Sequence, residues 1–217
     1  MSALRPKYIV VHTAAYDGRN CDRDMIDQWH RDRGWNGIGY HYTIINDKHD
    51  TIEDGTVQIG RDINIAGAHA RGINNRSIGI CCIGHGDHQP FTDLQNESLI
   101  RLVSELIDQY EDLRVDNVIG HRELNALVTK GALRKEYATT KTCPGKKVHM
   151  ETLREQVRKY REIPEVEHRP REMTPADKDE VIAALNVLER KAAGLFPNAR
   201  GELREFLTHP EVMVFRS

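Results

Sequence analysis

Short runs of apolar residues, bounded by turn-forming residues, predict the strands of this chain. Four of them are KYIVVH (7–12), GIGYHYTII (37–45), SIGICCIG (77–84) and VDNVIGH (115–121). A fifth, around Thr51–Glu53, follows a turn at Asp47–Asp50 and is expected to pair with 37–45 as a hairpin. The run 77–84 is apolar on both faces, which favours a central place in a sheet.

Apolar residues at helical spacing predict helices between these strands. Asp22 is a capping residue for a helix that carries Met25, Ile26 and Trp29 and ends at Gly34. Thr92 and Gln95 form a capping box, which is followed by an apolar stripe from Leu99 to Tyr110. A further helix is expected from about Val148 to Arg161. Strands and helices alternate, so the chain is predicted to be α/β, with a mixed central β-sheet flanked by helices.

The pattern divides the chain into two parts, 1–163 and 164–217. Residues 54–76 are a long Gly- and Asn-rich loop of the kind that shapes a site. After 163 the chain is charged and interrupted by proline, which predicts a linker. Thr174-Pro175 then begins a predicted helical hairpin. We expect this C-terminal helical extension to pack on the first domain or to contact a protein partner through residues 174–208.

Composition and charge exclude some classes of partner. The chain is 39% hydrophobic and 29% charged, with a net charge of −2, so nothing predicts a nucleic-acid partner or an anionic membrane surface. No apolar run approaches the roughly 20 residues of a membrane span. The first apolar run, Tyr8 to Val11, is too short for a signal peptide. We therefore expect synthesis in the cytoplasm, and any exit from the cell would use another route.

The stretch ATTKTCPGKK (138–147) raises the question of what Cys143 does. A disulfide is disfavoured in a reducing cytosol, which leaves a nucleophile or a metal ligand. His12 and His121 each end a predicted strand, and the ends of parallel strands meet at one edge of a sheet. Two imidazoles and a thiolate suit zinc and leave its fourth position open. The spacing alone does not decide whether Cys143 is a nucleophile or a metal ligand.

Five segments in order resemble a known family: VVHTAA, DMIDQWHRDRGWNGIGYHYTI, IGRDINIAGAHARGINNRSIGICCIG, GHRE and KTCPG. They are similar to the zinc-dependent N-acetylmuramoyl-L-alanine amidases of type 2, the superfamily of phage amidase lysozymes and animal peptidoglycan recognition proteins. The resemblance spans residues 8–145 and implies a peptidoglycan recognition protein-like fold. It also implies one Zn²⁺ ion held by His12, His121 and Cys143.

The resemblance also implies a reaction, the cleavage of the amide between N-acetylmuramic acid and the L-alanine of the stem peptide. Zinc lowers the pKa of a bound water to roughly 7 and polarises the carbonyl. Lys141 matches a family lysine and would place positive charge beside the oxyanion. Tyr40 matches the family tyrosine that faces the metal, and would hydrogen-bond the water or the tetrahedral intermediate.

Other residues are expected to contact peptidoglycan or muropeptide. These substrate-binding candidates are Trp35, His69, Arg71 and Asn75. For His69 the alternative is a hydrogen bond that braces the loop, and for asparagine it is turn geometry. His85 and His88 resemble a metal pair, but the sequence offers no third partner, so we interpret them as part of a surface loop.

One departure bears on the mechanism. Cytoplasmic recycling amidases carry a glutamate in the strand that resembles 77–84, and Cys81 stands there in this chain. The tyrosine–lysine pattern of the phage lysozymes is therefore expected. The sequence predicts an endolysin-like peptidoglycan hydrolase. The alternatives are a non-catalytic peptidoglycan-binding module and a structural or regulatory phage component on the same scaffold.

Overall fold

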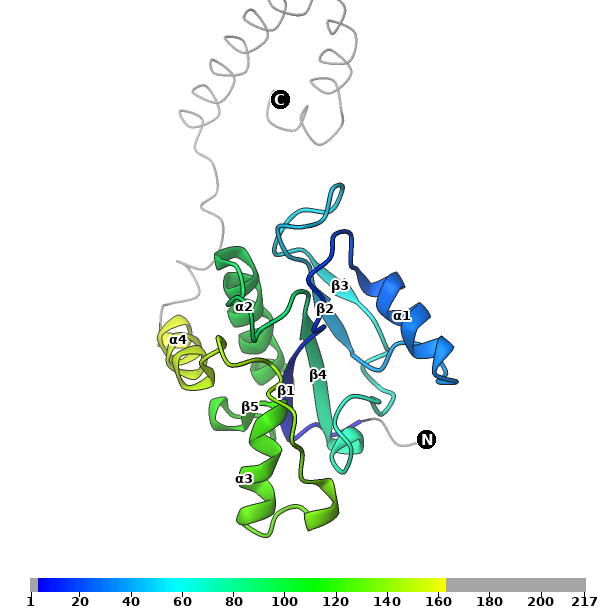
Figure 1. The fold of residues 1–217 in the computed structure, drawn as a ribbon. Helices are drawn as coiled ribbons and strands as arrows, with labels where there is room; N and C mark the ends of the chain where they lie inside the picture. Colours follow the sequence, from blue (N-terminus) through cyan, green and yellow to red (C-terminus); the bar gives the residue numbers. More distant parts are fainter. Residues whose placement is uncertain (1–3, 163–217) are drawn as a thin grey trace, which may run out of the picture. The chain divides into compact units, whose positions relative to one another are not determined.

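The computed structural model describes residues 4–162, which form one mixed five-stranded sheet with helices on both faces (Figure 1). The strand order is β3-β2-β4-β1-β5. β4 is parallel to both β1 and β2, β5 is parallel to β1, and only β3 is antiparallel to its neighbour. The strands are β1 (Tyr8–Thr13), β2 (Tyr42–Ile44), β3 (Val57–Ile59), β4 (Ser77–Cys82) and β5 (Val118–Gly120). The expected α/β fold and the central place of 77–84 are confirmed.

Three of the helices follow the sequence pattern. Asp22 caps the first, with its side chain accepting the Met25 N–H, and Thr92 and Gln95 form the expected capping box. Such caps satisfy N–H groups that would otherwise be left unpaired at the start of a helix. The α-helices are α1 (Arg23–Asp32), α2 (Asp93–Gln109), α3 (Leu124–Thr129) and α4 (Met150–Glu162), and short 3₁₀ helices lie at Asn74–Arg76, Val115–Asn117, His121–Glu123 and Lys135–Tyr137.

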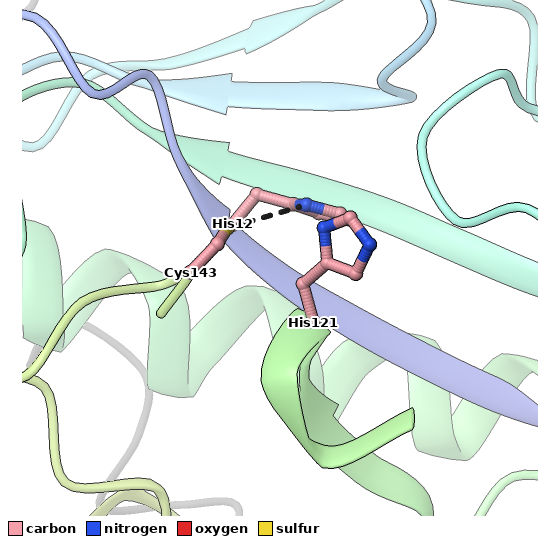
Figure 2. Close-up of side chains that lie close together, drawn as sticks. All are labelled: His12, His121 and Cys143. Atoms are coloured by element: carbon pink, nitrogen blue, oxygen red, sulfur yellow. Dashed lines mark hydrogen bonds between the residues drawn. The ribbon is translucent and has the colours of Figure 1, made fainter. Parts of the chain in front are cut away.

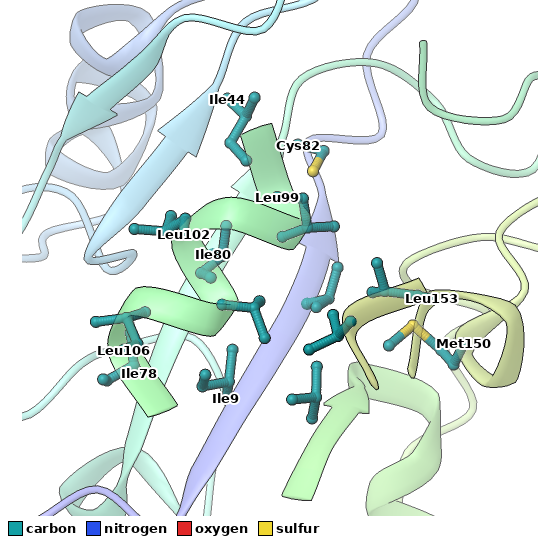
Figure 3. Close-up of a cluster of buried hydrophobic side chains, with 14 of the residues drawn as sticks. Ile9, Ile44, Ile78, Ile80, Cys82, Leu99, Leu102, Leu106, Met150 and Leu153 are labelled. Carbon is teal, nitrogen blue, oxygen red and sulfur yellow. The ribbon is translucent and has the colours of Figure 1, made fainter. Parts of the chain in front are cut away.

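The two faces of the sheet have different roles. One face packs against α2 and α4 (Figure 3). From β1 it receives Ile9 and Val11, which meet Leu99 and Leu106 of α2. Because side chains alternate along a strand, His12 falls on the opposite face. The first face is therefore a hydrophobic core, and the second leaves room for polar side chains at its carboxyl edge.

Two of the secondary-structure predictions were wrong. The second strand of the hairpin is Val57–Ile59, not Thr51–Glu53. The hairpin closes at Gly55, whose N–H donates to the Ile45 carbonyl and whose φ of +80° favours glycine, so Thr51–Glu53 stays within the connecting loop. The segment between β5 and Cys143, where the sequence pattern predicted no helix, contains α3. The predicted linker and helical hairpin at 164–217 lie outside the described residues.

Within residues 4–162, every helix is too short or too polar to cross a bilayer.

Candidate metal centre and active-site cleft

The two strand-end histidines come together at the carboxyl edge of the sheet. His12 lies near the end of β1, and His121 directly follows β5, its parallel neighbour. The register pairs Val11 with Gly120, so the next residue on each strand is a histidine. Their ring centroids are 4.8 Å apart. The two residues predicted from strand ends are therefore neighbours in space.

Cys143 reaches the same point from the loop before α4. Its Sγ lies 3.6 Å from Nδ1 of His12. Figure 2 shows the side chains of His12, His121 and Cys143 gathered together. One ligand atom from each lies within 4.8 Å of the others, so the three could hold a metal ion. The donors, two imidazole nitrogens and one sulfur, form a set that suits zinc.

Arg122, which the sequence reading missed, holds the Cys143 loop in place. Its backbone N–H donates to the Cys143 carbonyl at 2.7 Å. Its guanidinium donates to three further carbonyls along this loop, those of Thr142, Gly145 and Val148. Because Arg122 follows His121, the turn that places one candidate ligand also fixes the loop that carries another. The GHRE segment contains this residue, but no local pattern shows what it binds.

Burial sets the protonation of the three side chains. It lowers the pKa of His12 well below its usual value, with His69 the next contributor. Burial, followed by the charge of Lys141, lowers the pKa of His121 to about 4. Burial raises the pKa of the Cys143 thiol to about 11. The imidazoles are therefore neutral at pH 7, as metal ligands must be. The thiol is protonated without a metal, which argues against a free thiolate nucleophile.

His69 is placed against His12 and is 9% exposed. Its Nδ1 lies 3.0 Å from Nε2 of His12, the ring nitrogen that does not contact Cys143. The Asn74 side chain accepts the backbone N–H of His69 at 2.9 Å and so fixes this part of the loop. In β4, Gly79 has no side chain where the His69 ring packs. A partner on the second nitrogen fixes the orientation of a ligand imidazole.

Tyr40 stands beside the candidate ligands. The centroid of its ring is 5.0 Å from that of His12. Burial, followed by Cys81 and Cys143, raises the pKa of Tyr40 well above its usual value. The hydroxyl therefore keeps its proton at neutral pH and is available as a hydrogen-bond donor.

A cleft of two adjoining hollows, each of about 370 Å³, opens over this cluster. Lys141 is exposed and lines both hollows, as do His69 and His121. Trp35, 41% exposed, also lines both, and its ring contacts His30. The cleft therefore presents an aromatic ring and a positive charge beside the candidate metal ligands.

The loop residues of the substrate prediction lie in different places. Arg71 lines the first hollow, with its guanidinium 5.7 Å from the centroid of the Tyr137 ring. Asn75 is exposed and lines neither hollow, whereas its neighbour Asn74 lines the first. The sequence analysis did not identify Tyr137 as a cleft residue, because it belongs to a short 3₁₀ helix that no sequence pattern predicted.

A family model described as N-acetylmuramoyl-L-alanine amidase matches residues 2–146, about two thirds of the chain. The chain belongs to this family.

Relatives and solved structures agree with that assignment. The endolysin of Escherichia phage T7 is 38% identical over 109 residues, which cover 48% of this chain and 68% of the relative. Peptidoglycan-recognition protein SC2 of Drosophila melanogaster is 29% identical over 133 residues, covering 57% of this chain and 67% of the relative. The amidase LysC of Clostridium intestinale URNW superposes with a TM-score of 0.56 at 30% identity, covering 71% of this chain and 87% of that one. These are amidases and recognition proteins of one superfamily.

Cys81 lies on the strand next to His12. Cys81, which pairs with His12 across β4 and β1, is fully buried. Burial, followed by Cys82, raises the pKa of the Cys81 thiol well above its usual value. A buried, protonated thiol does not accept a proton at neutral pH, so this strand supplies no carboxylate or other base beside His12.

Proposed function

We propose that this protein is a zinc hydrolase that cleaves the amide between N-acetylmuramic acid and the L-alanine of peptidoglycan. The observation that carries the proposal is the convergence of His12, His121 and Cys143 beside Lys141 in an open cleft. Family membership supports the same reaction class.

The metal would be held by Nδ1 of His12, the imidazole of His121 and the Cys143 thiolate. When bound, zinc supplies a Lewis acid that activates water and polarises the scissile carbonyl. His69 holds the His12 ring through its second nitrogen, so that Nδ1 stays directed at Cys143. We therefore propose that His69 positions a metal ligand rather than binding substrate. This role extends the expected bracing hydrogen bond from the loop to the metal site.

Lys141 and Tyr40 would act on the reacting amide. The ammonium of Lys141 lies at the junction of the two hollows, where it stabilises the negative charge that develops on the carbonyl oxygen. Tyr40 keeps its proton at neutral pH and donates a hydrogen bond to an oxygen of the same centre. Neither role needs a carboxylate base, which agrees with the buried thiol of Cys81.

The rest of the cleft would bind the substrate. The first hollow presents Arg71 and the Tyr137 ring, which suit the polar and charged groups of a stem peptide. The exposed ring of Trp35 offers a flat apolar surface to a sugar or peptide. Asn75 lies outside both hollows, and we assign it no contact.

Lysis of the cell wall is the biological role we propose, because the phage relatives are named endolysins. The enzyme would reach the wall after release from the cytoplasm or export.

Mass spectrometry of the soluble products from purified peptidoglycan tests the reaction, with and without a zinc chelator. We expect free stem peptides that begin at L-alanine, their loss with chelator, and their return when zinc is restored. The Lys141→Ala variant, which retains all three ligands, serves as the matched control for enzyme chemistry. Zinc-loaded protein that binds intact wall without releasing peptide would instead establish the recognition-type binding module.

A further inference from the structure

A second group of possible metal ligands lies at the margin of the cleft. Asp17 is in the loop after β1, and His85 and His88 are in the loop after β4. Since β1 and β4 are parallel neighbours, both loops leave the same edge of the sheet. One ligand atom from each of the three lies within 4.8 Å of the others. No third partner for the two histidines was evident from the sequence, and the fold supplies Asp17.

The three side chains lie close together, and a turn of one imidazole ring would direct all three donors at one ion. Nδ1 of His88 lies 2.8 Å from Oδ2 of Asp17. The rings of His85 and His88 are stacked, with centroids 3.8 Å apart and 11° between their planes. Two imidazoles and a carboxylate are a donor set for a divalent transition metal, because imidazole suits zinc, copper and nickel better than magnesium or calcium.

An independent observation is the unpaired nitrogen of His85. Its Nδ1 is buried and has no hydrogen-bond partner among residues 4–162. Buried polar atoms in folded proteins almost always have a partner. An imidazole nitrogen without one, next to a second imidazole and a carboxylate, marks a place where a ligand is expected.

The backbone of this loop is held by bonds that do not depend on a metal. The Gly84 carbonyl accepts the Thr13 hydroxyl at 2.7 Å and the Tyr16 N–H at 3.1 Å. The His85 carbonyl accepts the His88 N–H at 2.8 Å, which closes the turn between the two histidines. The backbone that carries the two histidines is therefore ordered before an ion binds, and only the imidazole rings have to turn.

We propose that Asp17, His85 and His88 form a second site for a divalent transition metal, weaker than the site of His12, His121 and Cys143. The side chains of His88 and Asp17 are 60% and 49% exposed, so the ion exchanges with solvent and keeps water in its open positions. The site contains no thiolate, which lowers its affinity for zinc relative to the first site. This second site takes no part in the proposed amidase reaction, and the evidence for it does not depend on that reaction.

The second site borders the loop that carries Cys143. Between the two histidines, Asp87 accepts the Thr142 hydroxyl and the Lys146 N–H, both at 2.7 Å. The Gly86 carbonyl accepts the Lys147 N–H at 2.8 Å, and any side chain at Gly86 would collide with the Pro144 carbonyl. An ion on His85 and His88 would thus brace the segment against which the Cys143 loop rests.

Zinc titration of the full-length protein tests the proposal. The first site is filled with one equivalent, and further Zn²⁺ is followed by isothermal titration calorimetry. We expect a second, weaker equivalent in the wild type, and its loss in both His88→Ala and Asp17→Asn. The first equivalent stays in both variants. His149→Ala removes an exposed histidine outside the cluster and should keep both equivalents.

A second readout guards against indirect effects. In long-range ¹H–¹⁵N spectra of the imidazoles, the ring nitrogens of His85 and His88 should shift as the second equivalent is added, while those of His30 stay fixed. A titration that stops at one equivalent would overturn the proposal, and so would a second equivalent that survives in both His88→Ala and Asp17→Asn.

Discussion

The two clusters of possible ligands show what burial does to similar side chains. His12, His121 and Cys143 sit over the sheet, where burial keeps the imidazoles neutral and the thiol protonated until a metal binds. Asp17, His85 and His88 lie on loops at the same edge, where the side chains of Asp17 and His88 are 49% and 60% exposed. Loss of solvation therefore favours the uncharged forms of the first cluster. In the second cluster, His88 and Asp17 form an exposed hydrogen-bonded pair.

The largest effect is expected from removing the sulfur of the first cluster. Cys143→Ala leaves two imidazoles and should abolish retention of zinc through desalting, and with it the release of stem peptides. Metal content measured by elemental analysis checks the result. Cys82→Ala is the control, since Cys82 is a free cysteine that packs in the core against α2, away from the cluster. Stoichiometric zinc in Cys143→Ala would refute the ligand assignment.

Lys141→Ala should separate metal binding from catalysis. Lys141 is exposed and is not a ligand, so zinc content should stay at one equivalent. Loss of a charge beside the oxyanion should lower kcat by about 10²- to 10³-fold. Steady-state release of stem peptide provides the measurement. Unchanged turnover would remove Lys141 from the mechanism.

His69 tests how far the first cluster depends on its surroundings. Replacing His69 with phenylalanine removes the partner of His12 Nε2 and should weaken zinc binding by about 10- to 100-fold. Competition with a chromophoric chelator measures this affinity. His69→Gln, which restores a polar partner, should recover part of it. Equal zinc affinity in the wild type and both variants would show that His69 has no positioning role.

The smallest effect is expected at the second cluster in the absence of metal. The pair of His88 and Asp17 is solvent-exposed, and pairs of this kind contribute about 0–1 kcal/mol to stability. Asp17→Asn should therefore change the free energy of unfolding of the metal-free protein by less than about 1 kcal/mol. Urea unfolding followed by circular dichroism checks the value. A larger loss would mean that the cluster is a structural element of the fold.

Much of the fold follows from local sequence patterns. The strands around Val10, Ile80 and Ile119 and the caps at Asp22 and Thr92 are set by residues a few positions apart, and the structure confirms them. Local patterns did not predict the elements that are too short to show a clear periodicity. Val57–Ile59 is a strand of three residues, and α3 is a helix of only six.

The candidate site divides in the same way. The sequence by itself placed His12 and His121 at strand ends and identified Cys143 as the third ligand candidate. Only the tertiary structure brought Cys143 to His12, across 131 positions of the chain, and set His69 behind the ring. Strand order and register decide such contacts, because they determine which distant loops share an edge of the sheet. The same edge joined Asp17 to His88, a pairing that no local pattern indicates.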